Sequence, residues 1–135
     1  MDPASTSPAR AARIVYLALI GGVVGATVVF SLVRPVASGP AAPILVYIPF
    51  AMAVPLFAGA LLLAGRLPRP GSTADPDAWW RANLPRALTI WAMLEGPSLY
   101  GAVVWPLTDS YLPLAVIAVG LFLFSVTAPR RLMEG

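Results

Sequence analysis

Residues 87–105, ALTIWAMLEGPSLYGAVVW, form an apolar stretch with a single carboxylate, Glu95, near its middle. At a rise of about 1.5 Å per residue, a helix of this length crosses the roughly 30 Å hydrocarbon core of a bilayer. A charged side chain near the centre of a spanning helix costs about 2.5 kcal/mol or more. The stretch therefore indicates a membrane protein and marks Glu95 as a candidate functional residue.

The rest of the chain has the composition of a membrane protein, with 59% hydrophobic and 11% charged residues among 135. Polar borders divide it into four apolar stretches, each long enough to span a bilayer. We expect an all-α integral membrane protein with four transmembrane helices in an antiparallel bundle. The predicted spans are 14–33, 44–64, 88–107 and 111–128, within a domain over 13–129, between a flexible N-terminus over 1–12 and a tail over 130–135.

The arginines give the orientation of the predicted bundle. They lie at the ends of the apolar stretches and form no single basic cluster in the sequence, which argues against nucleic acid as a partner. Eight lie in the N-terminal segment, the second loop and the tail, and only Arg34 lies in the loops of the opposite side. Because arginine is enriched in cytoplasmic loops, we expect an inner-membrane protein with both termini in the cytoplasm.

The second loop contains a helix start signal, since Asp75 is an N-cap residue and Pro76 follows at the first helical position. We expect a short interfacial helix over about 76–84. Its paired indoles and its arginines would lie at the level of the lipid headgroups and phosphates. The alternative is a docking surface for a partner protein, made by the same residues: Trp79, Trp80, Arg81 and Arg86.

The backbone around Glu95 is predicted to be irregular. Pro97 lacks the N–H that would bond to the carbonyl of Met93, and Gly96 leaves room for another backbone or a water molecule. This pattern indicates either a helix kink with no further role or a specific polar site.

Glu95 itself is expected to face the interior of the bundle or a partner, because lipid disfavours the charged form. We expect it to be neutral and to donate a hydrogen bond. Ser98 and Tyr100 are its nearest candidate partners in the sequence.

The first span contains small residues four positions apart, which allow two helix backbones to pack closely. The pairs are Gly21 with Gly25 and Gly22 with Ala26. Their partner is either another span of the same chain or a second copy of the chain in a homo-oligomer.

Enzyme chemistry finds little support in the sequence. The chain has no Cys and no His, which removes thiolate chemistry, the usual zinc sites and the usual haem ligands. No base, nucleophile and orienting group converge in the sequence. We therefore expect no catalytic residues, no metal and no cofactor.

Residues 92–104, AMLEGPSLYGAVV, resemble the carboxylate-bearing helix of the proteolipid subunit, which forms the rotor ring of rotary ATP synthases. In that family a glutamate is followed by small residues and then by Tyr-Gly. The resemblance covers thirteen of 135 residues and implies that Glu95 carries an ion. The chain is also similar to small four-span bacterial membrane proteins of unknown role that have a glutamate in the third span.

Two functions follow from these patterns. The first is a non-catalytic accessory or assembly subunit of a larger membrane complex, for example a bioenergetic one, that acts through helix packing. The alternative is translocation of protons or cations by Glu95. The expected partners are membrane lipids and other membrane-protein subunits, with a second copy of the chain as a further candidate.

Overall fold

The computed structural model describes residues 7–33, 43–71, 74–108 and 110–134, which form helices joined by short loops and contain no strand. The predicted all-α class is confirmed. The elements in chain order are α1 (Pro8–Leu32), α2 (Ile44–Gly65), α3 (Pro76–Val104), the short 3₁₀ helix η1 (Trp105–Leu107), α4 (Leu112–Val126) and α5 (Pro129–Glu134).

Three of these helices, α1, α2 and α3 continued by η1, are long and apolar enough to cross a membrane. This is the pattern of a multi-pass membrane protein. α4 is equally apolar but has 15 residues, a rise of about 22 Å. It ends earlier than the predicted span because Pro129 disfavours helical backbone at the residue before it. The Thr127 hydroxyl also donates to the Leu123 carbonyl at this end, at 2.9 Å.

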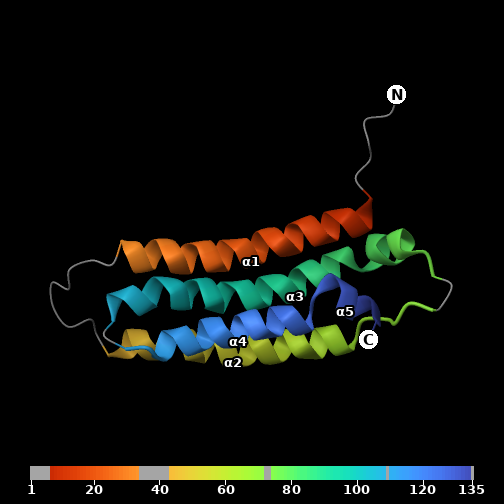
Figure 1. Ribbon diagram of the computed structural model, residues 1–135. Helices are drawn as coiled ribbons and strands as arrows, with labels where there is room; N and C mark the ends of the chain where they lie inside the picture. The colour runs from red at the N-terminus through yellow and green to blue at the C-terminus, as the bar shows by residue number, and fades with distance from the viewer. Residues whose placement is uncertain (1–6, 34–42, 72–73, 109, 135) are drawn as a thin grey trace.

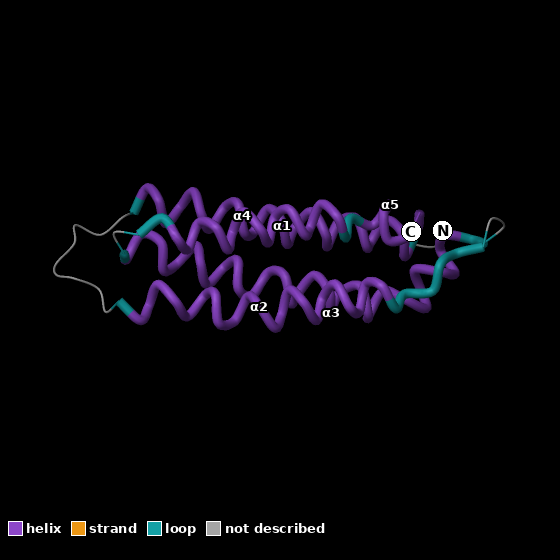
Figure 2. The backbone as a smooth tube through the Cα atoms, turned by 90° about the horizontal axis from the view of Figure 1, so that it is seen from below, coloured by secondary structure: helices purple, strands orange, loops and turns teal. Residues whose placement is uncertain are grey.

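The four longer helices lie along one common axis (Figure 1). Seen from below, α1 and α4 lie along one side and α2 and α3 along the other (Figure 2). α3 is the central helix, because it packs against α1, α2 and α4, whereas α1 packs mainly against α3. Half of the apolar span of α3 is buried, against 6% for α1. α1 is therefore a peripheral helix attached to the other three.

Two predicted boundaries differ from the structure at the ends of the chain. α1 begins at Pro8, so part of the predicted flexible N-terminus is helical. The Ser7 hydroxyl caps it by accepting from the N–H of Arg10, at 3.3 Å. The predicted C-terminal tail, over 130–135, lies in α5 up to Glu134.

The interfacial helix predicted over 76–84 is not a separate element. It forms the first part of α3, which continues through Pro85 to Val104. The predicted N-cap is present, since Asp75 Oδ1 accepts from the N–H of Asp77, at 3.1 Å. Asp77 Oδ1 in turn accepts from the N–H of Ala9, at 3.1 Å, and so joins the starts of α1 and α3.

The paired tryptophans also differ from the prediction. Trp79 and Trp80 are 8% and 2% exposed and pack inside the chain, so they do not point outward to lipid headgroups or to a partner. The indole N–H of Trp79 donates to the Pro68 carbonyl at 2.8 Å, and that of Trp80 donates to the sulfur of Met133 at 3.1 Å. The indoles turn inward because each N–H finds an acceptor within the chain.

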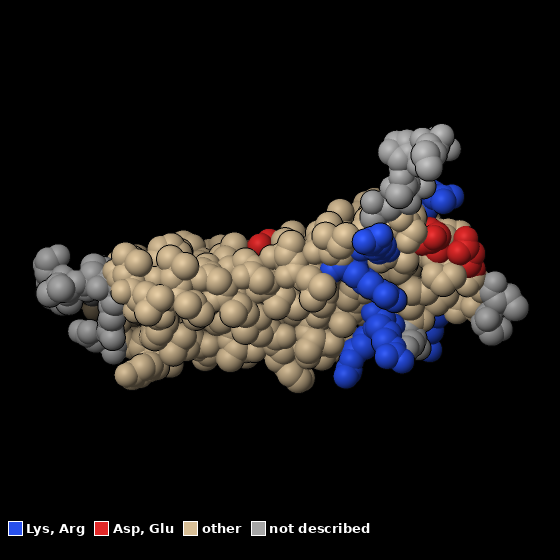
Figure 3. Space-filling view, turned by 45° about the horizontal axis from the view of Figure 1, so that its top comes forward, with Lys and Arg blue, Asp and Glu red and all other residues tan. Residues whose placement is uncertain are grey.

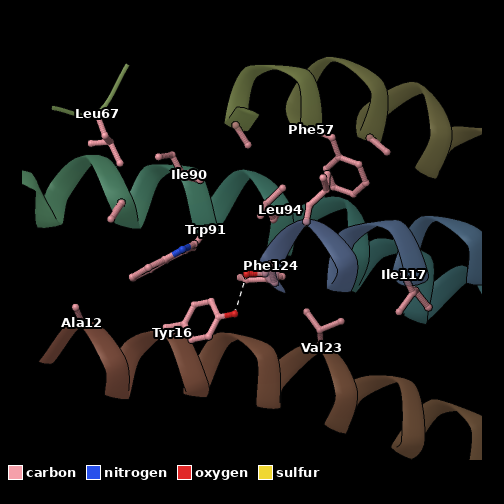
Figure 4. Close-up of a cluster of buried hydrophobic side chains, with 14 of the residues drawn as sticks. Ala12, Tyr16, Val23, Phe57, Leu67, Ile90, Trp91, Leu94, Ile117 and Phe124 are labelled. Atoms are coloured by element: carbon pink, nitrogen blue, oxygen red, sulfur yellow. Dashed lines mark hydrogen bonds between the residues drawn. The ribbon is translucent and has the colours of Figure 1, made fainter. Parts of the chain in front are cut away.

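These indoles extend an aromatic cluster that joins α1, α3 and α4. Tyr16 packs against Trp91 and Phe124, with ring centroids 5.3 Å and 6.0 Å away. Its hydroxyl donates to the Phe124 carbonyl at 2.7 Å (Figure 4). Trp91 is fully buried, and its indole N–H donates to the Thr127 carbonyl at 3.0 Å. The cluster is one of the attachments of α1 to the bundle.

Candidate functional site around Glu95

Glu95 lies on the side of α3 that faces α1. A Cβ atom added at Gly22 of α1 would lie 3.6 Å from Glu95 Oε1. Because glycine has no side chain, the carboxylate fits beside the backbone of α1. The Glu95 side chain is half-buried, and part of it reaches the surface of the molecule.

The surface around this region is apolar. Figure 3 shows a single red spot on the tan body of the bundle, well away from the blue and red side chains gathered at one end. Between Asp77 and Glu134, Glu95 is the only carboxylate that the structure describes. On α3, Arg86 lies nine residues before Glu95, and on α1, Arg13 lies nine residues before the adjoining Gly22, a rise of about 14 Å in each helix.

No hydrogen bond or ion pair joins Glu95 to another of the described residues. Two hydroxyl groups of α1 bond to backbone carbonyls. Tyr16 donates to the Phe124 carbonyl, and Thr27 Oγ1 donates to the Val23 carbonyl at 2.8 Å. A group outside the described residues, or a proton, has to compensate the carboxylate in an apolar environment.

The two predicted partners of Glu95 lie elsewhere. Ser98 is fully buried, and its Oγ donates to the Leu94 carbonyl at 2.7 Å. It packs against Gly120 of α4, where an added Cβ would overlap Ser98 Oγ. Tyr100 is half-buried and, five residues from Glu95, points about 140° away around the helix. The structure therefore does not bring Glu95, Ser98 and Tyr100 together as one site.

The predicted irregularity at Gly96 and Pro97 does not interrupt α3, which is helical through both residues. Pro97 is buried in the bundle, and its ring is part of the packed interior. Gly96 is exposed, and a Cβ atom there would meet no other atom within 4 Å. Gly96 therefore leaves α3 open to the outside beside Glu95.

The small residues of α1 divide into two groups. Gly22 lies beside Glu95, and Ala26 packs against the buried cluster. Gly21 and Gly25 face open space, with no atom within 4 Å of an added Cβ. Only the Gly22 and Ala26 pair therefore takes part in packing within the chain.

Close packing in the bundle depends on glycines that the sequence analysis did not single out for this role. A Cβ at Gly101 of α3 would lie 3.0 Å from the Pro113 carbonyl oxygen of α4, and one at Gly120 would meet Ser98. Gly59 of α2 leaves room for the side chain of Met93. The sequence signal was present in α3, where Ser98, Gly101 and Ala102 are small residues at helical spacing.

The described residues contain no group of three His, Cys, Asp or Glu side chains that could hold a metal ion. A scan against protein-family models, a search of curated proteins and a search of solved structures found no match to this chain.

Proposed function

We propose that this chain is a non-catalytic accessory or assembly subunit of a larger membrane complex, and that it acts through helix packing. The observation that carries the proposal is the environment of Glu95. The carboxylate lies half-buried on an apolar surface and has no donor among the described residues. It adjoins α1, whose apolar side chains are largely exposed. A helix of another subunit could cover α1, and a hydrogen-bond donor on that helix could bond to the Glu95 carboxylate.

The polar groups inside the bundle support a packing role. The buried hydroxyls of Tyr16, Ser98 and Thr127 each donate to a backbone carbonyl of the bundle. The Tyr16 bond joins α1 to α4, whereas Ser98 and Thr127 bond to carbonyls of their own helices, so all three hydroxyls are used in the structure of the bundle.

In this proposal the chain is an antiparallel bundle of four spans in the inner membrane, with both termini in the cytoplasm. α4 runs along the bundle beside α2 and α3, which supports its crossing the membrane with them (Figure 1). Its shorter apolar length is compensated by local thinning of the bilayer. The gathering of arginines at one end supports the orientation (Figure 3).

The first test is purification of the tagged chain from its own host in a mild detergent, followed by mass spectrometry of the proteins that come with it. We expect stoichiometric recovery of other membrane subunits. Glu95→Ala should reduce that recovery, whereas Thr89→Ala, on an exposed side of the same helix, should not. Recovery of the chain alone would contradict the proposal.

A second test adds bulk to the exposed surface of α1. A Cβ added at Gly25 meets no atom within 4 Å, so we expect Gly25→Leu to leave the fold intact and to reduce co-purification if a partner helix packs there. Gly65→Leu is the matched control, because this glycine at the end of α2 also faces open space. Equal recovery with both variants would place the partner on another surface.

The second candidate function is translocation of protons or cations by Glu95. It is supported by the same free carboxylate, since a side chain that no donor holds can gain and release a proton. The resemblance of residues 92–104 to the carboxylate helix of rotor-ring proteolipids points to the same role.

Proton flux into liposomes that contain the purified chain, or its complex, separates the two candidates. Glu95→Gln keeps the size and hydrogen bonding of the side chain but cannot exchange a proton. Loss of flux with assembly intact would favour translocation, and Glu95→Asp should then retain part of the flux. Flux that is unchanged by Glu95→Gln would eliminate translocation through this residue.

A further inference from the structure

One side of α3 is left open by its neighbours. Glu95 adjoins α1, Met93 adjoins α2 and Ser98 adjoins α4, each beside a glycine of that helix. At about 100° per residue, α1 and α2 lie about 160° apart around α3, and α4 lies in the wider arc between them. α3 runs between α1 and α2 (Figure 1), which make at most marginal contact with each other in the described residues. The narrower arc, on the side away from α4, is therefore open to the outside, and we call it the open face of α3.

The open face of α3 carries small, exposed residues next to Glu95. On a helical wheel Ala92, Val103 and Gly96 fall about 60°, 80° and 100° from Glu95, within the open arc. Ala92 and Gly96 are exposed, and Val103 is 39% exposed. A Cβ atom added at Gly96 would meet no atom within 4 Å, whereas one added at Gly101, on another side of α3, would meet α4. A further helix can therefore approach the backbone of α3 closely along the open face.

Glu95 lies at the edge of the open face, where α3 meets α1. Its half-buried carboxylate forms no hydrogen bond or ion pair with another of the described residues. The apolar parts of the four longer helices, over 14–32, 44–65, 87–104 and 112–126, contain no Lys, Arg or His. The nearest arginine before it on α3, Arg86, lies about 14 Å away along the helix. A cation that balances Glu95 at its own depth therefore has to come from another molecule.

We propose that the open face of α3 binds a transmembrane helix of another subunit, and that this helix carries a lysine or an arginine at the depth of Glu95. The ammonium or guanidinium group donates hydrogen bonds to the carboxylate and balances its charge. The small residues Ala92 and Gly96 let the two helices pack closely beside this pair. A second copy of the chain fits less well, because its own spans bring no cation to this depth. The inference rests on the proposed function and names the chemistry of the partner.

The first test uses the full chain in phosphatidylcholine vesicles, with a model transmembrane peptide of leucine and alanine as the probe. The peptide carries one lysine at its centre, and the control peptide carries leucine there. Energy transfer from a dye on Gly71→Cys to a dye on the peptide measures association. We expect the lysine peptide to associate on the order of tenfold more tightly than the leucine peptide. Equal association of the two peptides would overturn the proposal.

Three variants show whether Glu95 and the open face are responsible. Glu95→Gln keeps the size of the side chain and should remove most of the preference for the lysine peptide. Gly96→Leu fills the open face and should weaken binding of the lysine peptide by a similar factor. Gly65→Leu adds the same bulk at an open position of α2 and should bind like the original chain. A preference that survives Glu95→Gln, or equal losses with the two leucine variants, would contradict the proposed site. Circular dichroism and gel filtration establish that each variant is folded.

The native partner separates failure of this inference from failure of the proposed function. The tagged chain is photo-crosslinked in its own host with benzoylphenylalanine in place of Val103, and in place of Val54, which is 70% exposed on α2, as the control. From Val103 we expect a crosslink to an apolar segment of another protein that contains a lysine or an arginine. A crosslink to a second copy or to a segment without a basic residue, or co-purification of other subunits with no crosslink from Val103, would overturn the inference and leave the proposed function standing. Recovery of the chain alone would contradict both.

Discussion

At the scale of single residues, glycine determines how closely α3 and α4 approach each other. We expect Gly120→Ala to destabilise the chain by about 1–3 kcal/mol, because the new methyl group would overlap Ser98 Oγ and lie 3.3 Å from the ring of Phe57. Unfolding in mixed detergent micelles measures the change. Gly21→Ala, at an open position, should be neutral or slightly stabilising. Equal effects of the two changes would contradict this packing.

The Tyr16 hydroxyl provides a second test at this scale. Tyr16→Phe removes the hydrogen bond to the buried Phe124 carbonyl and keeps the ring in contact with Trp91. We expect a loss of about 1 kcal/mol in the free energy of unfolding. Tyr47→Phe, at a side chain that is 63% exposed, is the control and should cost almost nothing. A Tyr16→Phe variant as stable as the original chain would show that this bond does not hold α1.

At the scale of elements, the borders of α2 could be predicted from sequence more accurately than the start of α3. α2 was predicted over 44–64 and is observed over Ile44–Gly65, because polar or helix-breaking residues lie at both ends. α3 starts twelve residues before the predicted span, at Pro76 instead of residue 88, because Pro85 does not end the helix. The contacts of Trp79 and Trp80 could not be predicted, since their acceptors lie in other segments.

For the candidate site, too, contacts between different helices could not be predicted from sequence. The apolar setting of Glu95 could be read from sequence, because a carboxylate in a span is rare. The separation of Glu95 from Ser98 could not be predicted, because this separation depends on which neighbouring helix packs against each side of α3. Ser98 faces Gly120 of α4, and Glu95 faces Gly22 of α1. Sequence spacing alone places the two residues within one turn of each other.

The attachment of α5 to α3 can be tested at Met133, whose sulfur accepts the hydrogen bond from the indole N–H of Trp80. We expect Met133→Ala to loosen α5 and expose Trp80, which shifts tryptophan fluorescence to longer wavelength and increases quenching by acrylamide. Arg131→Ala, at an exposed position on the same helix, should leave the spectrum unchanged in neutral detergent. An unchanged Met133→Ala spectrum would mean that the other contacts of α5 suffice.

At the scale of the whole molecule, the absence of cysteine allows the topology to be mapped directly. Single cysteines at Ser7, Gly71, Tyr111 and Arg131 can each be tested with a membrane-impermeant maleimide in oriented vesicles. If α4 and the other three long helices all cross, Ser7→Cys, Gly71→Cys and Arg131→Cys react from the cytoplasmic side, and Tyr111→Cys, which precedes α4, reacts from the other. Labelling of Arg131→Cys from the same side as Tyr111→Cys would contradict the four-span topology.

The peripheral position of α1 also bears on the order in which the protein is made. α1 leaves the ribosome before α2 and α3, yet its main neighbour is α3, whose first residue is Pro76, and contact with α2 is marginal at most in the described residues. More than forty residues are therefore synthesised after Leu32 before α3 begins, and during this time α1 lies in lipid without its main neighbour. α1 is stable in lipid without that neighbour, because nearly all of its apolar span stays uncovered in the finished protein as well. Among the three candidate spans, α1, which is made before α2 and α3, is thus the one that depends least on its neighbours for burial.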